Sequence, residues 1–407
     1  MSCEEEVAAG TGPERAGTTF GQQMLLLFPL VLGMLGMQAA AGVLGTGIPL
    51  QMALSAVSPE TIGLVASAYA AGFAAGCLIS PALIGRFGYR KALACFVMLQ
   101  AAATVCLAFL PFEGWIALRA VMGACGAGAV VITEGWVNTA APAEVRGRIF
   151  GTVNMLGRMA MVAGQAAAAF PWALGTLAFV GPALLYAIAL AFMVPSVHGR
   201  PVTAATRGAG LGRSLSFLET PAVAAVGVIY VGAVGTTLIS VAPAWGVLVG
   251  MSSAAAAMLT VSVQIGSFVL QGPLLWLSDR MDRRLVILFA AIVTATCALV
   301  LLAIPSGHQA PLFLIYALIG GVSLPVYALS FATAFDHGGA VANFRLSSGL
   351  LFNWALGAVI GPTVATAAIA RYGPEGLLHF LVLTSAAVAL LLARLIRRAG
   401  HPNAPSK

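Results

Sequence analysis

Charge is the scarcest property of this chain. Only 8% of its 407 residues are Asp, Glu, Lys or Arg, whereas a soluble globular domain carries roughly 25%. Hydrophobic residues make up 60% of the sequence, and the mean hydropathy is +0.98. This composition excludes an ordinary soluble globule and places the chain in a lipid bilayer. Since a spanning helix takes about 20 residues, the length allows roughly a dozen crossings and no sizeable soluble domain.

Catalytic and metal-binding motifs are missing as well. The sequence has no HExxH, GxSxG or GxxxxGKS/T motif, and its only lysines are Lys91 and Lys407. Its 6 cysteines form no CxxC pair and no Cys/His cluster, so no disulfide framework and no metal site are expected. We therefore expect a protein that is not an enzyme, needs no cofactor and binds no nucleic acid.

Apolar segments of membrane-spanning length are abundant, and they predict an all-α membrane protein with twelve transmembrane helices. They lie at 24–46, 61–83, 91–111, 115–139, 148–170, 173–195, 220–247, 254–278, 285–304, 309–333, 346–370 and 376–396.

The basic residues predict the orientation, because Lys and Arg accumulate on the cytoplasmic side of membrane proteins. With the N-terminus inside, 17 of the 20 basic residues fall in cytoplasmic loops and tails, and only Arg371 faces outward. The other two, Arg119 and Arg158, lie within predicted helices. We expect a multi-pass protein of the cell inner membrane, surrounded by lipid, with both termini cytoplasmic. The net charge of +7 is thus explained by topology.

The twelve segments divide into two sets of six around the longest interior connection, which has no apolar periodicity. Arg86 and Arg90 follow the second segment as Arg280 and Arg284 follow the eighth, at an offset of 194 in both cases. Repeated halves are typical of secondary transporters, which bind their solute between them. The expected organisation is an N-terminal tail (1–20), a six-helix bundle (21–197), a linker (198–218), a second six-helix bundle (219–398) and a C-terminal tail (399–407).

Several segments resemble the major facilitator superfamily. Pro81–Lys91 and Gln271–Arg284 resemble its loop 2–3 and loop 8–9 signatures, and Arg119–Gly126 resembles its helix 4 motif. Glu134–Asn138 and Ser347–Leu351 are similar to a largely uncharacterised branch of bacterial permeases in that family. The resemblance implies two pseudo-symmetric six-helix bundles around a central cavity, with helices 3, 6, 9 and 12 outside it. Helix 5 lacks the Gly-Pro element of the family's drug/proton antiporters, which makes a multidrug antiporter a less favoured alternative.

Three ionisable residues lie within the predicted helices, where a charge costs at least a few kcal/mol and therefore suggests a function. Glu134 and Arg158 reach similar depths on neighbouring antiparallel helices and can pair. Glu134 is a candidate for proton coupling, and a static ion pair with Arg158 is the alternative. Arg119 is a second candidate for proton coupling or for contact with an anionic solute. The alternative for Arg119 is hydrogen bonding to helix-end carbonyls.

Polar side chains recur on single helix faces, at i, i+4, i+7 and i+11. In lipid such faces must turn toward other helices or toward a wet cavity. Hydrogen bonds that only join helices are the alternative for any single residue. The candidate solute-binding residues are Gln38, Asn154, Arg158, Gln165, Gln264, Tyr327, Asn353 and Trp354.

The cytoplasmic charged clusters are expected to form a gate, whose contacts exist in one state and separate in the other. A purely topological role for these arginines is the alternative. The candidate gate residues are Arg86, Arg90, Asp279, Arg280, Arg283 and Arg284.

Taken together, the sequence predicts a monomeric secondary transporter that moves a small organic solute by alternating access. The solute is expected to be an anionic or planar nutrient, with a vitamin such as riboflavin as one example. Coupling to protons and facilitated diffusion both remain open, as does the direction of transport. The other functions that fit are an efflux antiporter for drugs or metabolites and a sensor or assembly factor of the same architecture that does not transport.

Overall fold

The computed structural model describes residues 20–140, 145–197, 220–304, 307–335 and 340–399. Within these ranges the chain consists of helices and short turns, which confirms the predicted all-α fold. The expected linker and nearly all of the two expected tails lie outside the described residues. The first helices are α1 (Phe20–Leu54), α2 (Pro59–Leu107), α3 (Phe112–Ala140), α4 (Arg146–Ala167), the 3-10 turn η1 (Pro171–Ala173) and α5 (Leu177–Ser196). The later helices are α7 (Ala222–Ser240), α8 (Ala242–Leu248), α9 (Ser253–Ser278), α10 (Arg283–Ala303), α11 (Gln309–Ser323), α12 (Val326–Phe335), α13 (Ala340–Tyr372) and α14 (Glu375–Ala399).

Helix α2 contains two of the predicted spans. Its 49 residues would measure about 73 Å as one straight helix, more than twice the ~30 Å hydrocarbon core of a bilayer. Gly88 interrupts the helical dihedrals with φ of 76°, a conformation that suits glycine. Tyr69 and Gln100, from the two sides of this break, both flank Gly126 of α3. The two parts of α2 therefore lie side by side as separate spans.

Two other predicted spans are broken helices. The seventh consists of α7 and α8, which meet at Val241, two residues before Pro243. The tenth consists of α11 and α12, which are separated by Leu324 and Pro325. Proline has no N–H to donate and its ring clashes with the preceding turn, so it breaks a helix at these places. The sequence-based segments 220–247 and 309–333 did not contain these interruptions.

The number of spans agrees with the twelve expected. In the part of the chain that the structure describes, 10 helices are long and apolar enough to cross a bilayer, and α2 among them supplies two spans. The remaining span is α4, whose 22 residues give about 33 Å of helix. Asn154, Arg158 and Gln165 lower its hydropathy, and two of these residues face a cavity inside the protein, where a polar face is tolerated.

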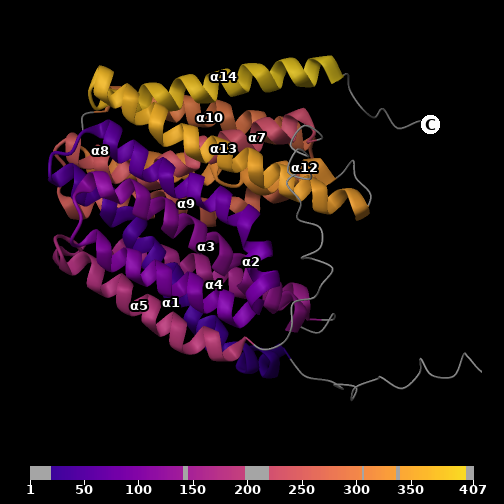
Figure 1. The fold of residues 1–407 in the computed structure, drawn as a ribbon. Coiled ribbons are helices and arrows are strands. Elements are labelled where there is room, and N and C mark those ends of the chain that lie inside the picture. The colour runs from indigo at the N-terminus through magenta and orange to yellow at the C-terminus, as the bar shows by residue number, and fades with distance from the viewer. Residues whose placement is uncertain (1–19, 141–144, 198–219, 305–306, 336–339, 400–407) are drawn as a thin grey trace, which may run out of the picture.

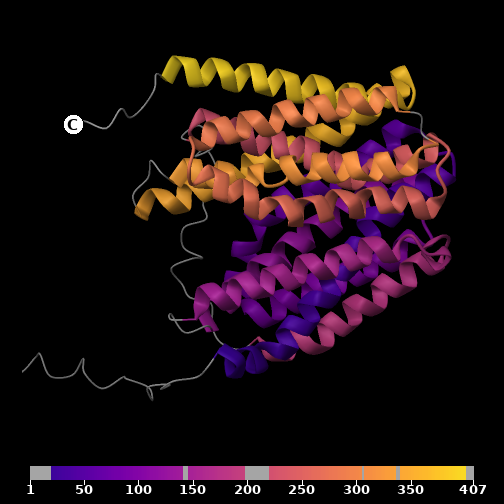
Figure 2. The ribbon, with the colours of Figure 1, turned by 180° about the vertical axis from the view of Figure 1, so that it is seen from behind.

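The buried hydrophobic side chains form two main clusters. One contains residues between Leu27 and Val197 together with Ala244, and the other contains residues between Tyr230 and Leu392 together with Leu50. We call helices α1 to α5 the first half and helices α7 to α14 the second half. Figure 1 shows the first half in the lower part of the molecule and the second half above it, and the same division is visible from behind in Figure 2.

The two halves touch at the end of the bundle that lies away from both ends of the described chain (Figure 1). There, the hydroxyl groups of Ser67 on α2 and Thr363 on α13 share a hydrogen bond of 2.8 Å. One turn earlier, Gly63 lies so close to Thr366 that a Cβ atom would overlap the threonine hydroxyl. We call this contact the α2–α13 seam. The absence of a side chain at Gly63 allows the two helices to meet.

Candidate functional site

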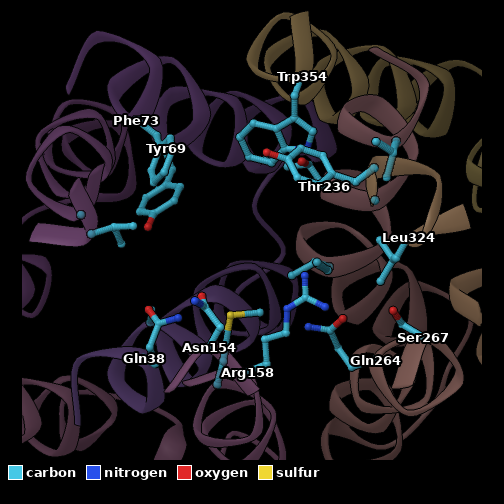
Figure 3. Close-up of a pocket in the computed structure, with 18 of the residues that line it drawn as sticks. Gln38, Tyr69, Phe73, Asn154, Arg158, Thr236, Gln264, Ser267, Leu324 and Trp354 are labelled. Carbon is cyan, nitrogen blue, oxygen red and sulfur yellow. The ribbon is translucent and has the colours of Figure 1, made fainter. Parts of the chain in front are cut away.

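A cavity of about 470 Å³ lies between the two halves. This volume is in the range that holds small organic ligands. Helices of both halves contribute to its wall, and Figure 3 shows their side chains around the open centre. Its polar and aromatic lining residues are Gln38, Tyr69, Phe73, Gln100, Asn154, Arg158, Tyr186, Thr236, Gln264, Ser267, Phe268, Gln271, Tyr327 and Trp354.

The polar face of α4 supplies one wall. Asn154, Arg158 and Met161 line the cavity in the expected i, i+4, i+7 register. Gln165, one turn further along this face, is 1% exposed and does not line the cavity. At that level α4 packs tightly against α1, because Gly164 lies against the backbone of Ala39. The face therefore leaves the cavity before it reaches Gln165.

The facing wall comes from α9, where Gln264, Ser267 and Gln271 line the cavity. Nη1 of Arg158 donates a hydrogen bond of 3.1 Å to Oε1 of Gln271. Arg158 belongs to the first half and Gln271 to the second, so this bond crosses the cavity. Figure 3 shows the Arg158 side chain reaching toward Gln264 as well. A guanidinium group surrounded by neutral amides remains available to a negatively charged ligand.

Aromatic rings from both halves complete the cavity. Phe73 of α2 and Trp354 of α13 meet edge to face, with ring centroids 6.1 Å apart. The ring of Tyr327 on α12 packs against that of Phe331, with 4.6 Å between the centroids. Such rings offer flat apolar surfaces to a planar ligand. Asn353 does not share this position: it is 4% exposed, and its Nδ2 has no hydrogen-bond partner in the described residues.

Two lining residues come from helices that the resemblance placed outside the cavity. Gln100 belongs to the third span and Tyr186 to the sixth, so that expectation was wrong for these positions. For Gln100 the physical reason is Gly126 of α3, which has no side chain to cover the amide. A Cβ atom there would lie 3.0 Å from the amide nitrogen of Gln100 and 3.2 Å from the hydroxyl of Tyr69. The amide of Gln100 within the otherwise apolar segment 91–111 was the signal in the sequence for a position that faces the cavity.

Glu134 is half-buried on α3 and is not among the lining residues. It interacts electrostatically with Tyr327, which does line the cavity. Arg158 also interacts with Tyr327, while its hydrogen bond goes to Gln271. The structure therefore places Glu134 and Arg158 within electrostatic range of the same tyrosine. Glu134 thus lies close enough to the cavity wall for its charge to affect the electrostatic field there.

Arg119 is 8% exposed and lies apart from the main cavity. Its guanidinium carbon is 4.2 Å from the centroid of the Tyr69 ring, in a cation–π contact. Its Nε has no hydrogen-bond partner in the described part of the chain. Hydrogen bonding to helix-end carbonyls, the alternative considered for this residue, is thus not what the structure shows for Nε. A buried charge without compensation costs several kcal/mol.

The candidate gate residues lie at the end of the bundle away from the α2–α13 seam. Nη2 of Arg283 is 3.5 Å from Oδ1 of Asp279, and the guanidinium carbon of Arg280 is 3.9 Å from the Trp276 ring. Arg86 and Arg90 flank the Gly88 turn, where both are exposed. Arg284 donates its backbone N–H to Asp282, which caps α10. Each of these contacts lies within one half, so a gate that joins both halves stays a prediction.

The sequence is similar to known membrane transporters over nearly its whole length. A family model described as the Major Facilitator Superfamily matches residues 30–345. The "Uncharacterized MFS-type transporter YcaD" of Escherichia coli (strain K12) is 26% identical over 400 residues, which cover 95% of this chain and 99% of that protein.

Solved structures show the same fold. The nucleoside transporter NupG superposes with a TM-score of 0.75 at 13% identity, covering 93% of this chain and 100% of NupG. A D-xylose-proton symporter gives a TM-score of 0.69 at 15% identity, covering 91% of this chain and 97% of its own. A bacterial homolog of the human lysosomal transporter Spinster, in an inward-facing and unoccupied conformation, gives a TM-score of 0.71 at 16% identity. The match covers 96% of this chain and 100% of that protein.

Proposed function

This chain belongs to the major facilitator superfamily, and we propose that it carries a small anionic or planar organic solute across the cell inner membrane by alternating access. The observation that carries the proposal is the cavity of about 470 Å³ lined by helices of both halves. A site at such an interface can be exposed to either side as the halves rock.

The chemistry of the lining supports an anionic solute. Arg158 is the charged residue among the described lining residues, and amide and hydroxyl groups surround it. A carboxylate can form charge-assisted hydrogen bonds with the guanidinium. Phe73 and Trp354 then provide apolar surface for a ring. A planar heterocycle with an acidic group, or a vitamin of the size of riboflavin, satisfies both requirements.

The contacts of the α2–α13 seam support an inward-facing state. If both termini are cytoplasmic, as the basic residues predict, the seam lies on the outer side and closes the cavity there. Residues 21–197 and 219–398 would then move as two bodies joined by the linker. Transport requires the Arg158–Gln271 bond to rearrange, so a solute that takes over this guanidinium contact can favour the change between states.

Glu134 is the proposed coupling carboxylate if transport is driven by protons. Its electrostatic link to Tyr327 connects its charge to the cavity wall. Arg119, the other residue expected to act in coupling, would contribute through Tyr69, which it contacts on one side and which lines the cavity on the other.

A thermal-shift screen of the purified full-length protein tests the solute class. A ligand that binds the folded state raises the melting temperature. We expect hits among carboxylated planar heterocycles and a loss of about tenfold or more in their affinity in Arg158→Gln, because a hydrogen bond to a charged group contributes roughly 1.5–3 kcal/mol. Hits should then show counterflow in proteoliposomes.

Two results would contradict the proposal. Hits confined to cations would exclude an anion-binding cavity. Tight binding without any counterflow would favour the sensor or assembly factor over a transporter.

A further inference from the structure

A second, much smaller cavity of about 10 Å³ lies beside Arg119. This space is close to that of one water molecule or one monatomic ion. Its wall is apolar apart from Arg119 and Ser240, and comes from α1, α2, α3 and α7. The lining residues are Gly45, Ile48, Pro49, Met52, Ile62, Val65, Ala66, Arg119 and Ser240.

The charge of Arg119 has no anionic partner among the residues that the structure describes. The ion pair recorded among the described residues is that of Arg283 with Asp279, at the other end of the bundle. The face of the Arg119 guanidinium is covered by Tyr69, while its Nε lacks a hydrogen-bond acceptor. Guanidinium groups remain protonated in proteins. A buried donor group of this kind requires a partner that the described side chains do not supply.

We propose that the small cavity binds a monovalent, monatomic anion such as chloride, held by Arg119. A water molecule could accept a hydrogen bond there, but it would leave the positive charge uncompensated. The cavity is too small for a polyatomic anion such as a carboxylate. The hydroxyl proton of Ser240 is donated to the carbonyl of Thr236 at 2.6 Å, so the guanidinium N–H groups carry the interaction.

The anion site is complete only while the halves touch at the seam. Ser240 belongs to the second half, whereas Arg119 and the residues from α1 and α2 belong to the first. Ile62 of this cavity is next to Gly63 of the α2–α13 seam. An anion bound there stabilises the state in which this end of the bundle is closed. Tyr69 separates the anion from the solute cavity, so this site is distinct from the one proposed for the solute.

Thermal unfolding of the purified full-length protein in sodium chloride and in sodium gluconate, at equal ionic strength, tests the proposal. We expect the melting temperature to rise in chloride by about 2 °C or more and to saturate, as binding to the folded state requires. Bromide should act as chloride does, and fluoride less, since it is more strongly hydrated. Arg119→Gln should lose the response, whereas Arg371→Gln, an exposed arginine at the same end, should keep it.

Gly45→Ala provides a variant that leaves Arg119 in place. A Cβ atom at Gly45 meets nothing within 4 Å, so the variant should fold and the added methyl group should occupy the cavity. The chloride concentration for half of the effect should then rise at least several-fold, while Gly272→Ala, which also adds a methyl group in open space, should leave it unchanged.

The proposal is overturned if the wild type shows no specific chloride response, which would indicate water alone, or if both Arg119→Gln and Gly45→Ala keep the wild-type response. Should Arg119→Gln fail to fold, Gly45→Ala decides alone. None of these measurements needs the solute, so their failure would leave the proposed transport intact.

Discussion

At the scale of single residues, Glu134 is a half-buried acidic side chain of α3 close to the wall of the solute cavity. Tyr327 of the cavity wall lies within electrostatic range of both Glu134 and Arg158. The neutral and ionised forms of Glu134 therefore present different fields at the cavity wall. In lipid, a carboxyl group at this depth is costly and suggests a function.

Replacement of Glu134 by Gln tests its role in coupling. If Glu134 exchanges the coupling proton, the pH dependence of solute uptake into proteoliposomes across the range from about pH 5 to 8 should be flattened. Exchange of solute against solute, without net proton movement, should continue. Glu113→Gln, on the exposed first turn of the same helix, is the matched control. An unchanged pH profile in Glu134→Gln would exclude Glu134 from coupling.

Part of the site was predictable at this scale. The spacing of Asn154 and Arg158, and of Gln264 and Gln271, follows helical periodicity, and the cost of polar groups in lipid turns such faces inward. Periodicity does not determine where along a face the cavity ends. Gln165 therefore lies in the helix packing although it continues the face that Asn154 begins.

At the scale of helices, the α2–α13 seam depends on a single glycine. A Cβ atom at Gly63 would overlap the Thr366 hydroxyl and lie 3.0 Å from the carbonyl oxygen of Pro362. Excess volume in a packed interface costs about 1–3 kcal/mol. When only one of two conformational states contains the interface, this cost changes the ratio of the two populations by roughly 5- to 150-fold.

Gly63→Val is therefore expected to favour the state in which the seam is open. Spin labels at positions 60 and 372, both exposed near the seam, report the distance between α2 and α13 by double electron–electron resonance. The variant should shift the distance distribution to longer values. Gly147→Ala, whose Cβ meets nothing within 4 Å, should behave as the wild type. A wild-type distribution in Gly63→Val would show that the seam does not control the state.

The turn between α9 and α10 allows stability and gating to be separated. The Asp279 side chain is 71% exposed and 3.5 Å from Arg283, and exposed ion pairs contribute roughly 0.2–1 kcal/mol. Asp279→Asn should change the melting temperature by less than about 2 °C but slow uptake several-fold if the pair belongs to a gate. Asp282→Ala, which removes the cap of α10, should leave uptake unchanged but lower the free energy of unfolding by about 1 kcal/mol. Wild-type uptake in Asp279→Asn would favour a purely topological role.

The helices themselves were predicted well where hydrophobicity alone defines them. The break between α11 and α12 was missed because segment 309–333 is apolar on both sides of Pro325. Hydropathy contains no information on backbone geometry inside a span. The prolines were visible in the sequence, yet Pro273 remains inside α9 without breaking it. Whether a proline interrupts a helix depends on the neighbours that satisfy the freed backbone groups.

At the scale of the whole molecule, the two hydrophobic clusters explain why twelve spans and a repeat of halves were accessible from sequence. Apart from Leu50 and Ala244, each half buries its apolar side chains in its own cluster, so the pattern of each half is determined locally. The identity of the solute cannot be predicted from the sequence in this way. It depends on side chains from both halves, such as Phe73 and Trp354, whose meeting follows from the docking of the halves and not from either sequence alone.

Reporter fusions test the orientation of the whole chain. The described chain begins and ends at the same end of the bundle (Figure 1), and the excess of Lys and Arg predicts that this end is cytoplasmic. Green fluorescent protein fused after Lys407 should fluoresce, and alkaline phosphatase fused there should be inactive. Alkaline phosphatase fused after Phe109 or Tyr372, at the opposite end, should be active. The reverse pattern would place the α2–α13 seam on the cytoplasmic side, and the structure would then represent an outward-facing state.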